Sequence, residues 1–180
     1  LGAGWNQREY TAFGFPYDHR VARFEEAFTI IRTLLGDGAI DFHGAYYDVT
    51  DSVLHPRSPR PGGPPLLVGS IGERMQGVTL PHVAAWNVWW SDYGNTSAGF
   101  ATVKSTVDAR IDALGRTGEV EGTCAVYVKL PTGTGRQMGD YPKTSLPIAG
   151  GPSEIAEQLR GFAVAGAAEI QLVVDPIVPS

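Results

Sequence analysis

The chain has 180 residues, of which 43% are hydrophobic and 18% charged, and its formal net charge at pH 7 is −5. This balance is typical of one globular domain with a substantial core, and it argues against a disordered chain and against a membrane protein. The acidic balance and the lack of any run of Lys or Arg argue against a nucleic-acid-binding surface, which needs clustered cations.

The first third of the sequence predicts a strand end, a loop, one helix and a small hairpin. Residues 1–5 read as the tail of a strand whose beginning is missing, so we interpret the sequence as a fragment, and residues 6–10 follow as a loop. Asp18 is expected to cap a helix, because apolar residues recur at three- and four-residue spacing up to Leu35. Residues 40–49 then predict a hairpin around His43.

Residues 64–75 predict a short buried strand, a glycine-bearing turn and a helix. The apolar run 66–68 does not alternate, as expected of a parallel strand covered on both faces. Gly69 and Gly72 allow close approach of the backbone, and a helix that begins near Glu73 would direct unpaired N–H groups at a bound anion. The turn therefore predicts either a phosphate site or simply tight packing.

The remainder predicts two further strand and helix pairs and a last strand. Strands are expected at 85–89, 123–130 and 170–174, and helices are expected from about 96 to 114 and from 152 to 166. The segment 131–147 between them is a long loop of the kind that serves as a lid or a binding segment. Trp86, Trp89 and Trp90 either line a flat aromatic ligand or belong to the core.

This order implies α/β architecture with parallel strands and crossover helices. Five strands, counting residues 1–5, fit a doubly wound sheet and part of a (β/α)8 barrel equally well, and the chain is shorter than the roughly 250 residues of a whole barrel.

Several short motifs occur in a characteristic order and spacing along nearly the whole chain. They are Leu1-Gly2-Ala3-Gly4-Trp5, Phe13-Gly14-Phe15-Pro16, Arg23-Phe24-Glu25-Glu26, Phe42-His43-Gly44-Ala45-Tyr46-Tyr47, Pro64-Pro65-Leu66-Leu67-Val68-Gly69-Ser70, Ala85-Trp86-Asn87, Gly115-Arg116 and Gly150-Gly151-Pro152-Ser153-Glu154. The ordered set resembles the luciferase-like monooxygenase superfamily, especially its coenzyme F420-dependent oxidoreductases.

The resemblance implies a partial TIM (β/α)8 barrel in which residues 1–180 are the C-terminal part of one domain. The strands would then be the fourth to the eighth, with the first three absent, and Leu67, Trp86, Val126 and Leu172 become candidates for the inner barrel face. The implied activity is hydride transfer between coenzyme F420 and a small organic substrate. The alternatives are an FMN-dependent monooxygenase and a truncated, non-catalytic half-barrel.

The resemblance also implies site residues, although the catalytic residues stay unknown because the family carries them on strands that precede this chain. The turn that would hold the cofactor phosphate consists of Gly69, Ser70, Ile71, Gly72, Glu73 and Arg74. The ring or substrate pocket would include Trp5, Gln7, Glu9, Trp86, Asn87, Trp89 and Trp90. The chain departs from the family in having Ser70, which is small and can donate a hydrogen bond, for a second glycine, and Ala84 for an aspartate. The second departure removes a carboxylate and puts the integrity of the site in doubt.

Other chemistry receives little support from the sequence. The four histidines are far apart without metal-ligand spacing, and no nucleophile elbow, Walker motif or paired cysteine motif occurs. Cys124 is expected to be a small core residue, and a single cysteine is consistent with a reducing, cytoplasmic location. The expected partners are a small-molecule substrate and a second copy of the chain, because open barrel edges favour self-association.

Overall fold

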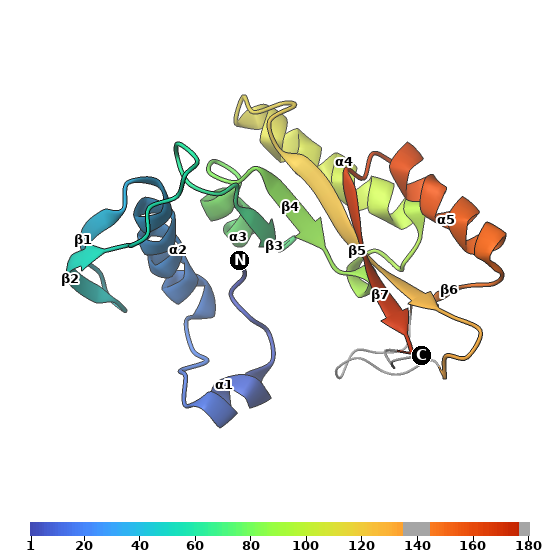
Figure 1. The fold of residues 1–180 in the computed structure, drawn as a ribbon, viewed down its shortest axis with the longest axis horizontal. Helices are drawn as coiled ribbons and strands as arrows, with labels where there is room; N and C mark the ends of the chain where they lie inside the picture. The colour runs from blue at the N-terminus through green and yellow to red at the C-terminus, as the bar shows by residue number, and fades with distance from the viewer. Residues whose placement is uncertain (135–144, 177–180) are drawn as a thin grey trace. The chain divides into compact units, whose positions relative to one another are not determined.

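The computed structural model describes residues 1–134 and 145–176 (Figure 1). The chain divides into two compact units, one formed by residues 1–66 and 72–79 and the other by residues 67–71 and the described residues from 80 onward. The chain passes between the units at 66/67, at 71/72 within the turn that follows β3 (Leu67–Gly69), and at 79/80.

The first unit contains three helices and an antiparallel hairpin. Its elements are α1 (Gln7–Phe13), α2 (Arg20–Gly36), β1 (Ala39–His43), β2 (Asp48–Val53) and α3 (Glu73–Thr79). The core of this unit is built on α2, where Phe24 and Phe28 are buried one turn apart with their rings stacked at 5.6 Å. The predicted helix and hairpin are therefore confirmed.

Two local predictions in this unit are wrong. Residues 1–6 form no strand, because their carbonyl groups accept hydrogen bonds from side chains and not from another strand. The Tyr10 hydroxyl donates to the carbonyl of Ala3, Arg20 to that of Gly4 at 2.7 Å, and the Tyr17 hydroxyl to that of Trp5 at 3.0 Å. The expected loop at 6–10 is instead the start of α1, since the Asn6 side chain accepts from the Arg8 N–H group at 3.1 Å and caps that helix.

The beginning of α2 also differs from expectation. His19, in the left-handed conformation with φ of 52°, is the residue before the helix, and its side chain makes no capping hydrogen bond. The main-chain and side-chain oxygens of Asp18 accept hydrogen bonds from Arg23 instead, at 3.1 and 3.3 Å.

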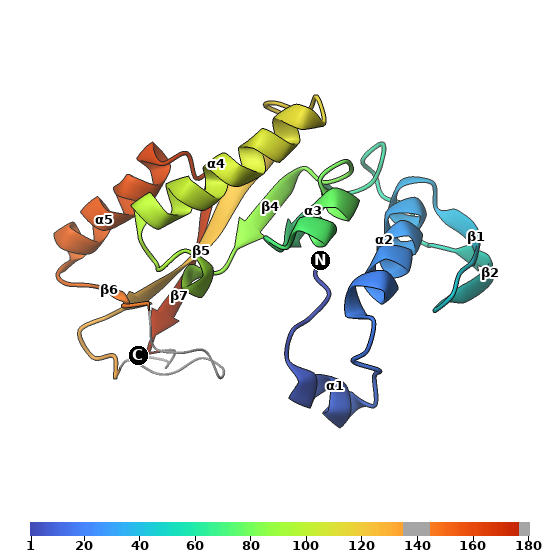
Figure 2. The same cartoon turned by 180° about the vertical axis from the view of Figure 1, so that it is seen from behind.

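The second unit is a five-stranded parallel sheet covered on one face by two helices. Its elements are β3 (Leu67–Gly69), β4 (Ala85–Val88), the 3-10 helix η1 (Trp90–Asp92), α4 (Ser97–Ala113), β5 (Glu121–Lys129), β6 (Ile148–Ala149), α5 (Pro152–Val164) and β7 (Glu169–Asp175). Strands β3, β4 and β5 are neighbours, and residues 123–129 of β5 also pair with the whole of β7, while residues 128 and 129 pair with β6. Figure 2 shows α4 and α5 lying across the same face of this sheet.

The four strands predicted at 66–68, 85–89, 123–130 and 170–174 are all present and parallel, which confirms the α/β prediction. The short strand β6 was not predicted, because two residues give no periodic signal in sequence. The predicted loop 131–147 lies partly outside the described residues, since 135–144 are not among them.

The two faces of the sheet follow from residue parity along the strands. Trp86 stacks on Phe100 of α4 at 6.0 Å, so Trp86 and every second residue from it face the helices. Val126 and Leu172 are register partners and lie on the same face of the sheet as Cys124. The Cys124 thiol contacts Tyr93, which packs against Phe162 of α5, so this is the helix-covered face. The prediction that Trp86, Val126 and Leu172 line the inner barrel face is therefore wrong, because residues buried on both faces leave no alternation from which to read parity.

The opposite face of the sheet, which we call the inner face, carries the residues of the other parity. Leu67 pairs with Ala85, which has the parity of Asn87, so the prediction that Leu67 lies on this face is confirmed. Thr123, Ala125 and Gln171 share the inner face, because register aligns Asn87 with Thr123 and Ala125 with Gln171. This assignment positions the polar residues described below.

The segment after β4 completes the sheet at a place where β5 has no strand beside it. Strand β4 pairs with residues 121–124 of β5, and β6 pairs only with residues 128 and 129. Between these, the Tyr93 hydroxyl donates to the carbonyl of Ala125 at 2.6 Å, and Asn95 hydrogen-bonds both the N–H and the carbonyl group of Tyr127. The segment between β4 and α4 thus has a structural role.

Candidate functional site

The predicted phosphate turn follows β3 and leads into α3. Gly69 is the last residue of β3 and is exposed. A Cβ atom added at this position would have no other atom within 4 Å. Ile71, Gly72 and Glu73 are also exposed, whereas Ser70 is half-buried and takes part in an interaction of its own. The backbone of Gly69 is therefore open to approach by a ligand.

Arg74 is the only cation of the predicted turn. Its guanidinium group lies 3.2 Å from the carboxylate of Glu25 on α2, and both side chains are largely exposed at 63% and 49%. An exposed ion pair contributes at most about 1 kcal/mol, so an anionic ligand can compete for this guanidinium group.

Three predicted pocket residues lie at the start of the first unit, in or beside α1. Trp5 is 51% exposed, Gln7 is the first residue of α1, and the Glu9 carboxylate accepts a hydrogen bond from the Asn6 side chain at 2.8 Å. The other four, Trp86, Asn87, Trp89 and Trp90, belong to the second unit. The seven residues thus divide between the two units, three in the first and four in the second.

Trp86 is placed where a ring-binding role does not fit. Its side chain is 1% exposed and packs against Phe100 beneath α4, on the helix-covered face of the sheet. Sequence reasoning treated the neighbouring Trp86 and Asn87 as one group, but adjacent residues of a strand point to opposite faces. Trp86 is a core residue, and Asn87 alone of the pair lies on the inner face.

Asn87 is the centre of a hydrogen-bonded network on the inner face, which we call the inner-face network and which consists of Asn87, Thr123, Gln171 and Glu169. The Asn87 NH₂ group donates to the Thr123 hydroxyl at 2.8 Å and to the side-chain oxygen of Gln171. The Thr123 hydroxyl donates to the carbonyl group of Trp86 at 3.0 Å, and the Gln171 NH₂ group donates to the carboxylate of Glu169. Three adjacent strands thus present connected polar side chains to one surface.

Sequence reasoning missed three members of this network. Thr123, Gln171 and Glu169 are distant from Asn87 in sequence, and only the parallel register β4, β5, β7 brings them together. The available signal was a polar residue inside each of several strands that are otherwise apolar, because a buried polar side chain needs a partner.

An aromatic group lies beyond the carboxyl end of β4. The rings of Trp89 and Trp90 are 3.9 Å apart between centroids, and Trp90 lies 5.4 Å from Tyr127 of β5. Trp90 and Tyr127 are each 6% exposed, while Trp89 is half-buried. Close by in sequence, partial burial raises the pKa of the Asp92 carboxyl group. Trp89 is therefore the member of this group with surface to offer a ligand.

Two further observations concern the titratable groups of the described residues. Burial raises the pKa of the Cys124 thiol to about 11, so the thiol is protonated at neutral pH, as expected of a core residue. In the described ranges 1–134 and 145–176, no three His, Cys, Asp or Glu side chains are grouped to hold a metal ion. Within the same ranges, no helix is both long and apolar enough to cross a membrane.

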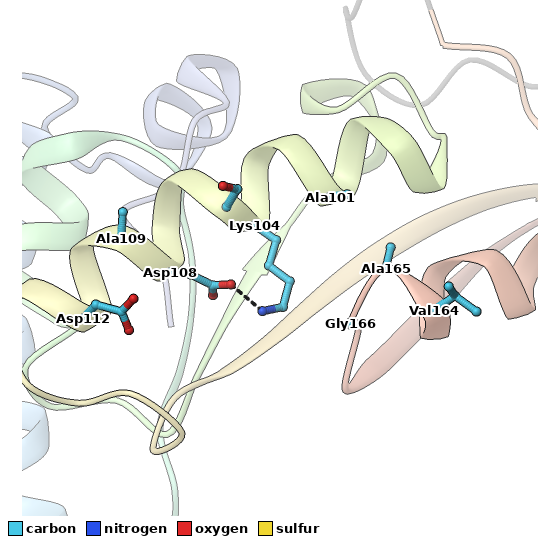
Figure 3. Close-up of a pocket in the computed structure, with 9 residues that line it drawn as sticks. Ala101, Lys104, Asp108, Ala109, Asp112, Val164, Ala165 and Gly166 are labelled. Carbon is cyan, nitrogen blue, oxygen red and sulfur yellow. Dashed lines mark hydrogen bonds and ion pairs between the residues drawn. The ribbon is translucent and has the colours of Figure 1, made fainter.

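Two cavities are each lined by residues of a single unit. A groove of about 470 Å³ runs between α4 and the end of α5, where Lys104 pairs with Asp108 at 2.7 Å (Figure 3). A second cavity of about 270 Å³ in the first unit lies beside α1 and α2 and is lined by apolar side chains with Arg20 and Arg23. Neither is lined by a predicted site residue.

The sequence is similar to a known family and to curated proteins. The profile described as luciferase-like monooxygenase matches residues 1–129. The pyrimidine monooxygenase RutA of a Caulobacter species is 30% identical over 129 residues, which cover 64% of this chain and 33% of that protein. The enzyme of the same name from Enterobacter cloacae is also 30% identical, over 122 residues. The chain spans about a third of the length of these curated relatives.

Solved structures with the same fold include a coenzyme F420-dependent reductase and a monooxygenase. The coenzyme F420-dependent tetrahydromethanopterin reductase of Methanopyrus kandleri superposes with a TM-score of 0.74 at 14% identity, over 99% of this chain and 68% of that one. The EDTA monooxygenase of a Chelativorans species superposes with a TM-score of 0.70 at 13% identity, over 97% of this chain and 60% of that one.

These likenesses show the fold, which is an α/β fold corresponding to part of a TIM barrel, as predicted. The family profile covers 129 of the 180 residues. The chain therefore belongs to the luciferase-like monooxygenase family.

Proposed function

We propose that the parent protein is an oxidoreductase that transfers a hydride between coenzyme F420 and a small organic substrate. Residues 1–180 would supply strands four to eight of a single barrel domain, with the first three strands provided by further chain. The likeness to a structure described as a coenzyme F420-dependent reductase supports this proposal. The cofactor would supply the redox chemistry, and the protein would bind it, orient it and exclude water.

The observation that carries the proposal is the inner-face network. The interior of a TIM barrel is normally filled by branched apolar side chains, whereas its carboxyl-terminal end carries the functional residues. Here Asn87, Thr123 and Gln171 place connected amide and hydroxyl groups on the inner face, beside the aromatic group at the carboxyl end of β4. Polar groups with an adjoining flat aromatic surface suit a heterocyclic ring.

We place the cofactor phosphate at residues 69–74. The open backbone at Gly69 supports this placement. So does the Arg74 guanidinium group, since a phosphate can compete with Glu25 for it, and the Ser70 hydroxyl adds a donor. Helix α3 has only seven residues, so the backbone N–H groups of the turn and Arg74 contribute more than the helix dipole.

An FMN-dependent monooxygenase is the second candidate. The curated relatives at 30% identity are described as pyrimidine monooxygenases, which favours oxygen chemistry. Both candidates require a phosphate site and a ring site, so the two differ mainly in which ring and tail the protein accepts.

Titration of the intact protein with F420 and with FMN tests the proposal, read by quenching of tryptophan fluorescence. We expect saturable binding of one of them, F420 under the first candidate and FMN under the second. The double variant Ser70→Ala, Arg74→Ala should bind about tenfold or more weakly, because hydrogen bonds to a charged group contribute about 1.5–3 kcal/mol each. Glu157→Gln on the exposed face of α5 is the matched control and should bind as the wild type does. If neither cofactor binds, the proposed function is wrong and a non-catalytic role for the chain is favoured.

A further inference from the structure

The inner-face network has a fixed hydrogen-bond direction, because each of its two ends is a group that can only accept. At one end is the main-chain carbonyl of Trp86, and at the other is the carboxylate of Glu169. An amide side chain such as that of Asn87 can normally be turned to exchange its oxygen and nitrogen. Fixed ends remove this freedom.

The Thr123 end fixes one hydrogen of Asn87. The Thr123 hydroxyl has a single proton, and at 3.0 Å the Trp86 carbonyl can only receive it. The contact between Thr123 and Asn87 at 2.8 Å must then be donated by Asn87. The Asn87 nitrogen therefore faces Thr123.

The Gln171 end fixes the other hydrogen. The Glu169 carboxylate accepts from the Gln171 NH₂ group, so the Gln171 oxygen is turned to the other side and accepts from Asn87. Both hydrogens of the Asn87 NH₂ group are thus committed to the protein. What the side chain has left to offer is its oxygen, Oδ1.

This oxygen is open to a ligand. Asn87 is half-buried, and none of the hydrogen bonds made by the described residues is donated to its Oδ1 atom. The indole nitrogens of Trp86 and Trp89 are buried without a hydrogen-bond partner, and Oδ1 of Asn87 is not buried in this way. The network therefore presents one accessible acceptor, and no donor, at position 87.

We propose that Asn87 is a specificity-determining residue that accepts a hydrogen bond from the imide N–H group of the cofactor ring. The pyrimidinedione edge that flavins and deazaflavins share offers a single N–H donor between two carbonyl acceptors. An acceptor that cannot be turned pairs only with that donor, so it fixes the orientation of the ring and rejects a ring without the N–H group. This inference rests on the proposed function.

The test compares each cofactor, FMN and F420, with its counterpart methylated on the imide nitrogen, in binding to the intact protein. The wild type should bind the methylated form of its cofactor about tenfold or more weakly, because the methyl group removes the donor and leaves Oδ1 desolvated without a partner. In Asn87→Ala this ratio should fall to about one. Gln158→Ala on the exposed face of α5 is the matched control and should keep the wild-type ratio.

A second variant separates orientation from mere structure. Thr123→Val with Glu169→Gln leaves Asn87 in place but removes the fixed direction at both ends, so the ratio should fall between those of the wild type and Asn87→Ala. Equal binding of both forms by the wild type overturns this inference and leaves the proposed function standing. Failure to bind any of the four compounds overturns both.

Discussion

The Asn95 side chain makes the hydrogen bonds to β5 that an adjacent strand would otherwise make. It is 3% exposed, has φ of 56°, and exchanges two hydrogen bonds with the main chain of Tyr127 at 2.9 and 3.0 Å. It also donates to the carbonyl group of Leu146 at 2.9 Å. Asparagine suits this place, because its amide carries a donor and an acceptor as a peptide group does and tolerates the left-handed conformation.

Replacing Asn95 should therefore destabilise the fold. Asn95→Gly keeps the backbone conformation available but leaves the buried N–H and carbonyl groups of Tyr127 unpaired, so we expect the free energy of unfolding to fall by about 2–4 kcal/mol. Asn95→Ala should lose up to about 1–2 kcal/mol more from backbone strain. Urea denaturation measures both. A loss below about 0.5 kcal/mol in Asn95→Gly would show that water replaces these hydrogen bonds.

The site residues were predictable from sequence only in part. Asn87 was found because it lies in a recognisable motif. Trp86 was assigned to the wrong face because β4 is buried on both sides, and Thr123 and Gln171 were missed because only strand register reveals that they are neighbours. Pairing between distant strands is not encoded in local periodicity.

At the scale of elements, β4 and β5 fit together through a size difference between Trp86 and Gly122. These two residues are register partners, and a Cβ atom at position 122 would lie 3.0 Å from the Trp86 indole. The indole is held in turn by Phe100 of α4. The missing side chain at position 122 thus makes room for the largest residue of the core.

Two glycine substitutions should consequently have opposite effects. Gly122→Ala should lower the free energy of unfolding by about 1–3 kcal/mol through overpacking against Trp86. Gly77→Ala, in the interior of α3 with no atom within 4 Å of the added Cβ, should raise it by about 0.5–1 kcal/mol. Thermal and urea unfolding of the pair test this. Equal effects would mean that the strands shift to accept the methyl group.

The hairpin of the first unit is joined to α2 through Glu26. Its carboxylate accepts the N–H groups of Ala45, Tyr46 and Tyr47 at 2.8 to 3.0 Å, so it holds the turn between β1 and β2. Partial burial raises the pKa of Glu26, but these hydrogen bonds together with Arg23 outweigh that effect and leave the pKa below its usual 4.5.

A lowered pKa means that this stabilisation is present above pH 4.5 and is lost as the pH falls through the folded-state value. We expect the amide chemical shifts of residues 45–47 to move toward random-coil values in acid. The Glu26→Gln variant should show the same change at neutral pH. Glu25→Gln, which removes only the pair with Arg74, is the control. Unchanged signals in Glu26→Gln would show that the turn does not need the carboxylate.

Most elements could be predicted because their signals are local. The strands at 85–89 and 170–174 are apolar except for one polar residue each. The helix from Ser97 is indicated by the Thr96 cap, which accepts from the Gly99 N–H group at 3.1 Å. Helix α1 and strand β6 escaped prediction because seven and two residues are too short for periodicity. Residues 1–5 look like a strand end, but their hydrogen bonds depend on side chains such as Tyr10 and Arg20.

At the scale of the whole molecule, the parallel sheet has β3 and β7 at its edges. Strand β7 carries Leu172, which lies on the helix-covered face and is nevertheless 52% exposed. An edge with unpaired backbone groups and an exposed apolar side chain favours pairing with another chain.

Residues 1–180 expressed alone should therefore self-associate. We expect light scattering to give a mass above the 19.2 kDa of one chain, increasing with concentration. Leu172→Lys should shift the equilibrium toward monomer, while Leu114→Lys, on an exposed residue at the end of α4, should not. A stable monomer with a cooperative thermal unfolding transition would show that the sheet edges do not drive self-association.

The most direct test of the central claim is a crystal structure of the intact protein with its cofactor bound. We predict the cofactor phosphate within hydrogen-bond distance of the backbone N–H groups of residues 69–74, and the ring against the inner face with its imide N–H group at Oδ1 of Asn87. A cofactor bound elsewhere, such as the groove between α4 and α5, would contradict the proposed site.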